Sequence, residues 1–223
     1  MTMPARRQRA RGSRQSVDKP VLDSLPMHVV ELDGLTDEAR FENAIIEQAA
    51  LRGASARGAV FDTCSIARSE MDETRLPGLR MLDVRIGKCG AANADWRGSH
   101  LRRIEFVQCR LTGLSMEGAD CRETSFMECR ADFARFAGAR LKNIRFEKCL
   151  LADADFSEAS LENVMFLECD LRNIDLGRAK LVSVDLRGSL LDGISIQADQ
   201  LRGLTIDPLQ APALVRMLGA RVE

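Results

Sequence analysis

The chain lacks several residues and segments on which common protein functions depend. It contains no tyrosine, one tryptophan and two histidines, His28 and His100, which lie far apart in the sequence. No apolar run approaches the length of a membrane-spanning helix. No apolar leader segment follows the basic residues near the N-terminus. We therefore expect a cytoplasmic protein that does not enter a membrane.

Chemical signatures are missing as well. The sequence has no glycine-rich phosphate loop and no nucleophile–base arrangement. Its seven cysteines include no Cys-x-x-Cys pair of the kind that binds metal. His100 lies beside Arg102 and Arg103 and is interpreted as a surface side chain. We therefore predict a non-enzymatic protein with no catalytic residues, no cofactor and no metal site.

What the chain does have is a strict five-residue period. Every fifth residue from Phe41 to Ile206 is apolar, which makes 34 positions without a break. Chance would give such a run with a probability of roughly 10⁻¹². Helices and strands have periods of about 3.6 and 2.0 residues. The pattern instead indicates a repeat architecture, in which each unit buries its apolar face by stacking on its neighbours.

Four of these pentads make a second period of twenty residues. Cysteines recur at this spacing from Cys89 to Cys169, and phenylalanines recur from Phe106 to Phe166. A coil of twenty residues with four equivalent sides would place each series in one vertical column. With about 4.8 Å between stacked strands, the pattern predicts about 8.5 coils and a rod roughly 40 Å long.

Within each pentad, side chains should alternate between inside and outside, as on a short strand. The fifth-residue position points inward, and so does the position two residues before it, which holds small or β-branched residues and most of the cysteines. Cys64 and Cys121 are placed inward too, so the thiols are interpreted as unreactive core filler. Glycine or asparagine often follows two residues after the large apolar residue, which indicates a turn with positive φ.

The segments 154–158 (Ala-Asp-Phe-Ser-Glu) and 139–143 (Ala-Arg-Leu-Lys-Asn) resemble the repeat of the pentapeptide-repeat proteins, whose consensus is Ala-Asp/Asn-Leu-x-x. The resemblance extends over about residues 39–208. It implies an all-β fold, a right-handed quadrilateral parallel β-helix. The end of the chain, after residue 206, also resembles the short C-terminal α-helix of dimeric family members.

These patterns divide the chain into four parts. Residues 1–26 form a basic tail that we expect to be disordered, and residues 27–38 form an N-terminal cap. Residues 39–208 form the pentapeptide-repeat β-helix, and residues 209–223 form a capping and dimerisation helix. The first twenty residues carry six basic side chains against Asp18. The tail could touch nucleic acid or anionic lipid, although we expect no direct nucleic-acid binding.

The C-terminal helix has more apolar residues than one amphipathic face needs. One set could cover the last coil while another set meets a second chain in a two-fold dimer. The alternative is a monomer in which the helix only caps the rod. The candidate dimer interface consists of Leu214, Val215, Met217 and Leu218.

Outward positions form surfaces of different character. The candidate basic patch on one wall is Arg80, His100, Arg102, Arg103, Arg122, Arg140 and Lys142. The candidate acidic patch on the opposite wall and its neighbour is Asp132, Asp153, Asp155, Glu158, Asp170, Asp175 and Asp192. The candidate protein-contact line over the phenylalanine column is Val107, Met127, Met165 and Leu167. Alternatively, the charges serve solubility and the corners partly shield the apolar side chains.

Two functions remain open from the sequence. The first is a binding module or scaffold whose walls recognise another protein. The second is implied by the resemblance, since some family members that confer quinolone resistance are DNA-mimicking dimers that bind DNA gyrase or topoisomerase. This chain makes a poor DNA mimic, because it has a basic wall and a net charge of only −6 outside its first twenty residues. It also lacks the register-breaking loops of the plasmid-borne resistance members. Anion binding by the basic wall is a third possibility.

Overall fold

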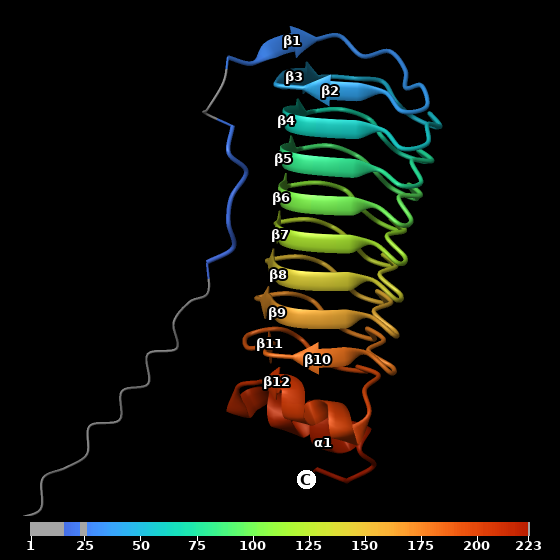
Figure 1. Cartoon of the computed structure of the whole chain (residues 1–223). Helices are drawn as coiled ribbons and strands as arrows, with labels where there is room; N and C mark the ends of the chain where they lie inside the picture. Colours follow the sequence, from blue (N-terminus) through green and yellow to red (C-terminus); the bar gives the residue numbers. More distant parts are fainter. Residues whose placement is uncertain (1–15, 23–25, 223) are drawn as a thin grey trace, which may run out of the picture.

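A computed structural model describes residues 16–22 and 26–222 of the 223-residue chain. Figure 1 shows a single column of stacked coils, with β1 at one end and the helix α1 at the other. Each coil takes twenty residues, because Phe106 pairs with Phe126 and Phe126 pairs with Phe146 on successive strands. The parallel β-solenoid that the five-residue period predicts is therefore confirmed.

The strands of the described residues form one parallel sheet. Its path runs β1-β3-β4-β5-β6-β7-β8-β9-β11-β12, while β2 pairs with β4 and β10 pairs with β9. The strands are β1 (His28–Val30), β2 (Arg40–Glu42), β3 (Ala44–Glu47), β4 (Val60–Ala67), β5 (Arg80–Gly87), β6 (His100–Val107), β7 (Asp120–Met127), β8 (Arg140–Glu147), β9 (Ser160–Leu167), β10 (Lys180–Val182), β11 (Val184–Asp185) and β12 (Leu204–Thr205). The helices are the 3₁₀ helices η1 (Ala198–Gly203) and η2 (Pro208–Gln210) and the α-helix α1 (Ala211–Met217).

The four sides of a coil are held together in two ways. Strands β4 to β9 each run along two sides and round the corner between them. The other two sides are joined by single bridges, such as Gly90 with Arg110. Each of these sides closes on a turn: the Ala94 N–H donates to the Ala91 carbonyl at 3.3 Å. We name the sides by one inward residue of each: the Leu101, Phe106, Leu111 and Phe136 walls, of which Phe136 lies one coil later than the other three.

A residue with positive φ stands at each corner of the solenoid. Every fifth residue from 38 to 193 has a φ between 50° and 77°. Glycine and asparagine corners such as Gly98 and Asn143 were expected, and their φ values of 63° and 55° confirm the turn. Charged residues such as Glu123 and Arg178 adopt the same conformation. The corner geometry is therefore imposed by the stacking of the coils, because these residue types do not favour it.

The inward positions form a continuous aromatic and aliphatic core. Phe106, Phe126, Phe146 and Phe166 are at most 2% exposed, and successive rings stack with centroids 4.7, 4.6 and 4.9 Å apart. Phe136 stands edge-on to this column, with its centroid 6.1 Å from that of Phe146 and an interplanar angle of 78°. Stacked and edge-on pairs are the two favourable aromatic arrangements, so the repeat satisfies both at once.

Cysteines occupy the small inward position, as the sequence predicted. All seven are buried and free of disulfides. In the column from Cys89 to Cys169, the thiols donate weakly to main-chain oxygens; the sulfur of Cys109, for example, lies 3.4 Å from the Val107 carbonyl oxygen. Burial raises the pKa of Cys89 to about 11, and it also raises the pKa of Cys121. Cys89 and Cys121 therefore remain neutral thiols at physiological pH.

The N-terminal end of the rod is covered by β1 and the segment after it. Strand β1 pairs with β3, and Leu32, which follows β1, joins the core. Residues 16–22 belong to the expected basic tail, and in Figure 1 they run beside the coils. The N–H of Asp18 donates to Glu123 Oε2 at 3.1 Å, and the N–H of Val21 donates to Asp83 Oδ1 at 3.0 Å. The expected disorder of residues 1–15 lies outside the described residues.

The C-terminal end is closed by a cap that two glutamines attach to the last coils. Gln200 Nε2 donates to the carbonyls of Leu176 and Ala179 at 2.8 and 2.6 Å. Gln210 Nε2 donates to the carbonyls of Leu186 and Ser189 at 2.6 and 2.7 Å. Each glutamine supplies donors that a further coil would otherwise provide.

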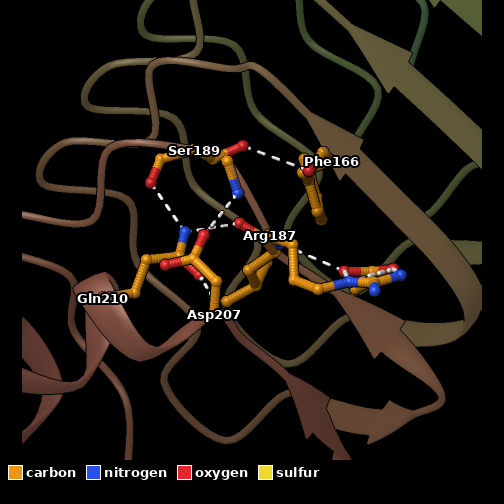
Figure 2. A network of polar contacts seen from close by, with 8 residues as sticks. Phe166, Arg187, Ser189, Asp207 and Gln210 are labelled. Carbon is orange, nitrogen blue, oxygen red and sulfur yellow. Dashed lines mark hydrogen bonds and ion pairs between the residues drawn. The ribbon is translucent and has the colours of Figure 1, made fainter. Parts of the chain in front are cut away.

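Asp207 completes this attachment at the start of η2. Its carboxylate accepts hydrogen bonds from the N–H groups of Gly188 and Leu209, at 2.9 and 3.0 Å. Figure 2 shows Asp207 and Gln210 side by side beneath Ser189. The helix expected near the C-terminus is present as η2 and α1. Its attachment by Asp207 and Gln210 was not foreseen from the sequence.

Replacing Gln210 by leucine should weaken the cap. The variant leaves the buried Ser189 carbonyl without its donor and the Leu186 carbonyl with only the Ser189 N–H at 3.2 Å, so we expect the free energy of unfolding to fall by about 1–3 kcal/mol. Urea unfolding followed by circular dichroism measures this loss. Leu209→Gln is the matched control, because that side chain is 91% exposed and its replacement should cost less than about 0.5 kcal/mol. Equal stabilities of the two variants would contradict the role given to Gln210.

The buried cysteines should not react with a thiol reagent in the native protein. Dithionitrobenzoate should label all seven cysteines in guanidinium chloride and none within minutes in buffer, because reagent cannot reach a neutral thiol inside the core. A Ser195→Cys variant provides the control, since residue 195 is exposed and its thiol should react at once. Rapid labelling of the parent chain would show that the thiol column faces outward.

Candidate protein-contact surfaces

The apolar line expected over the phenylalanine column lies on the Phe106 wall. Val107 and Met127 stack on neighbouring strands, but Glu147 follows them and separates them from Leu167. Val107, Met127, Met165 and Leu167 are each half-buried. Glu147 also pairs with Arg145 at 2.6 Å. The four candidates therefore share one wall but do not form an uninterrupted apolar surface.

The candidate basic patch lies on the Leu101 wall and at its corners, and carboxylates pair with more than half of it. Arg103 pairs with Asp83, Arg122 and Arg140 pair with Asp120, and Lys142 pairs with Glu162. Arg80, His100 and Arg102 form no ion pair within the described residues. These three line an open hollow of about 390 Å³. The basic character of the wall is therefore confined to its N-terminal half.

The Arg103–Asp83 pair is the most enclosed ion pair of this wall. Arg103 Nε lies 2.7 Å from Asp83 Oδ1, and only 9% of the Asp83 side chain is exposed. Burial raises the pKa of Asp83, but the hydrogen bonds from Arg103 and from the Val21 N–H outweigh it and hold that pKa below its ordinary value. The N-terminal segment is thus attached to a carboxylate that stays ionised.

The candidate acidic patch spreads over the Leu111 and Phe136 walls. Arg172 pairs with Asp170 at 2.6 Å, and Arg178 pairs with Glu158. Asp132 lies 3.7 Å from Arg130. Asp155 and Asp175 accept hydrogen bonds from the N–H groups two residues later. Asp153 and Asp192 form no ion pair within the part of the chain that the structure describes.

Three large apolar side chains on the Leu111 wall were not among the sequence candidates. Phe133 is 58% exposed, Leu150 is 38% exposed and Leu190 is 53% exposed. One signal in the sequence pointed to this wall, because Phe133 is the only phenylalanine outside the fifth-residue register. Leu150 and Leu190 occupy outward positions of the five-residue period, but they carry no charge and so belong to neither charged patch predicted from the sequence.

The four candidate dimer residues in the C-terminal cap differ in their exposure to solvent. Leu214 is 6% exposed and belongs to the core, and Met217 packs against that core. Val215 and Leu218 are 41% and 50% exposed. The assignment of Leu214 to an interface therefore needs correction, because one side of α1 covers the last coil. Beside α1 runs an apolar groove of about 220 Å³ lined by Leu201, Leu204, Ile206, Ala211, Leu214, Val215 and Leu218.

The described residues include no group of three or more His, Cys, Asp or Glu side chains arranged to hold a metal ion. Within the same residues, no helix is long and apolar enough to cross a bilayer. His28 and His100 are both exposed and lie on β1 and β6 respectively. The surfaces described above are consequently the candidate functional regions of the chain.

The chain was compared with protein families and with solved structures. Residues 99–176 match the family described as pentapeptide repeat region. QnrB1, a plasmid-mediated fluoroquinolone resistance protein, matches at 22% identity over 88% of this chain and 99% of its own, with a TM-score of 0.41. HetL from the cyanobacterium Nostoc, a pentapeptide repeat protein involved in heterocyst differentiation regulation, matches at 16% identity over 76% of this chain and 90% of its own, with a TM-score of 0.38.

A pentapeptide repeat protein from the thylakoid lumen of Arabidopsis thaliana matches at 18% identity, over 56% of this chain and 91% of its own, with a TM-score of 0.43. No curated protein sequence matches the chain. The matched residues lie within the stretch from 38 to 193 in which every fifth residue has positive φ. Residues 99–176 are thus similar to the pentapeptide repeat region, within a parallel β-solenoid.

Proposed function

We propose that this chain is a non-enzymatic rod that binds another protein through its walls and forms a homodimer through its C-terminal cap. One observation carries the proposal. The inward positions are filled by core side chains at most a few per cent exposed, so the interior has no space for a substrate. Any function must therefore use the outward side chains, which a rigid parallel stack holds in fixed positions.

The outward charges support protein binding more than DNA mimicry. A DNA mimic presents a continuous negative surface, but here the carboxylates of the acidic patch alternate with Arg172 and Arg178. Basic and acidic groups pair across coils on the Leu101 wall too, as in the Lys142–Glu162 pair at 2.7 Å. The exposed apolar side chains outside these pairs suit a contact with a folded protein.

The C-terminal cap supports the dimer. Val215 and Leu218 are 41% and 50% exposed beside the apolar groove of the cap. An apolar surface at the end of a repeat array is normally covered, either by a polar cap or by another chain. A two-fold contact through α1 would bury these side chains and double the length of the rod.

A dimer through the cap predicts a specific effect of charge. The double variant Val215→Asp/Leu218→Asp should sediment as a monomer at tens of micromolar, whereas the parent chain should sediment as a dimer. Arg216→Asp is the matched control, because it also changes the net charge by two units on the exposed part of α1, and it should remain dimeric. A monomeric parent chain in sedimentation velocity at that concentration would contradict the dimer.

A wall-specific contact can be tested with a photo-crosslinking amino acid in the cell from which the chain comes. Benzoylphenylalanine is placed at one exposed position of each wall: Arg102, Glu128, Leu190 or Glu158. We expect one wall to give a discrete crosslinked protein and the other walls to give none. No crosslink from any wall, or equal crosslinks from all four, would contradict a protein-binding rod. A gyrase subunit in the product, with inhibition of gyrase supercoiling by the purified rod, would favour the gyrase alternative.

A further inference from the structure

Phe133 is the one phenylalanine that the core does not use. Its side chain is 58% exposed, whereas Phe136, on the next inward position, is 1% exposed. Within the described residues, its ring stacks on no other aromatic side chain, while neighbouring rings pair throughout the core. Phe133 therefore contributes little to the packing of the solenoid.

The backbone conformation of Phe133 does not favour a phenylalanine at this position. The residue stands at a corner with a φ of 58°, a conformation that bulky side chains rarely adopt. Of the residues with positive φ from 38 to 193, Phe133 is the only large apolar one; the others are glycine, polar or charged. Five of those corners are asparagine, which tolerates the left-handed conformation better. Neither burial nor backbone preference accounts for a phenylalanine at this position.

Phe133 has a glycine at the equivalent corner on one side and carboxylates near it. The equivalent corner one coil earlier is Gly113, which has no side chain to cover the ring. The equivalent corner one coil later is Asp153, whose carboxylate forms no ion pair and accepts one hydrogen bond, from Asn173 Nδ2 at 3.2 Å. Asp132 precedes Phe133, and only Arg130, at 3.7 Å, lies near its carboxylate. The ring is therefore an exposed aromatic between carboxylates.

We propose that Phe133 is the anchor by which the Leu111 wall binds a protein partner that offers the apolar face of a helix bordered by lysine or arginine. The inference rests on the proposed binding function and names the wall and the chemistry of the partner. Interface energy concentrates in a few aromatic or arginine side chains that fill pockets on the partner. The carboxylates of Asp132 and Asp153 complement a cationic border, and a cation can also approach the face of the ring. Leu150, which is 38% exposed on the same wall, extends the apolar contact.

The test uses a fluorescein-labelled synthetic amphipathic helix of leucine and lysine, with a leucine–glutamate helix as the opposite-charge probe. Fluorescence anisotropy should show binding of the lysine peptide and no binding of the glutamate peptide. Phe133→Asn should weaken binding about tenfold or more, as expected for an interface anchor. Asp153→Asn should weaken it about threefold and lower its salt dependence. Glu168→Asn is the matched control: it removes one carboxylate from a left-handed corner of another wall and should leave affinity unchanged.

A stability measurement separates an anchor from a structural residue. Because asparagine suits the left-handed corner, Phe133→Asn should unfold at the same temperature as the parent chain or about 2 °C higher. A lower melting temperature with unchanged peptide affinity would show that Phe133 serves the fold and would overturn the proposal. Binding of neither peptide by the parent chain would overturn it as well.

Crosslinking distinguishes failure of the Phe133 proposal from failure of the general binding function. If benzoylphenylalanine on the Leu101, Phe106 or Phe136 wall captures the partner, and the Phe133→Asn substitution leaves that crosslink intact, the Phe133 anchor is refuted while the rod remains a binding protein. If benzoylphenylalanine at position 133 gives the same crosslinked protein as position 190, and an excess of the leucine–lysine peptide reduces both crosslinks, both proposals stand.

Discussion

Parallel stacking in a register of twenty residues places every side chain against its own equivalent one coil away, and the rest of the molecule depends on this constraint. For apolar side chains the arrangement is favourable, since Phe126 lies between Phe106 and Phe146 at centroid distances of 4.7 and 4.6 Å. For charged side chains it is unfavourable, because like charges directly opposite each other repel. Arg102, Arg122 and Lys142 stack in one column. Asp120 and Glu162 on neighbouring positions offset that repulsion.

The same register leaves a problem at each end of the rod. A parallel stack ends on a row of main-chain groups that have no further coil to pair with, and such an edge invites pairing with another chain. At the C-terminal end, Gln200 and Gln210 donate side-chain hydrogen bonds to the free carbonyls, and Asp207 accepts from the free N–H of Gly188. The cap thus satisfies the polar groups of the edge but leaves Val215 and Leu218 exposed.

Closure of the interior determines where function can reside. The thiols, which are the most reactive side chains of many proteins, are all enclosed in the core here. The outward side chains are held at the spacing of the coils, and most charged ones pair with a neighbour. The exposed large apolar residues are therefore the surface features that the fold itself does not explain. Phe133 stands apart among them, because its backbone conformation is unfavourable for its side chain.

The five-residue period predicted a solenoid, and the recurrence of cysteine and phenylalanine every twenty residues predicted that each coil has four sides. It also assigned Phe146, Cys109 and Trp96 to the interior, where each is at most 2% exposed. It could not predict that Glu123 and Arg178 adopt positive φ, since their residue types disfavour it and only stacking enforces it. It did not predict which charges of the basic and acidic patches form ion pairs. Some pairs join neighbouring coils, such as Arg103 with Asp83, and others depend on how two side chains of one coil are oriented, such as Arg172 with Asp170.

The sequence by itself thus determined the architecture and the inward face, for which local periodicity is enough. Only the tertiary structure decided which outward side chains stay exposed. It buried Leu214 under the cap, left Leu218 and Phe133 exposed and attached Val21 to Asp83. Exposure of an outward side chain depends on what the neighbouring coil or a distant segment places beside it. That information lies between residues twenty or more positions apart and not within any single repeat.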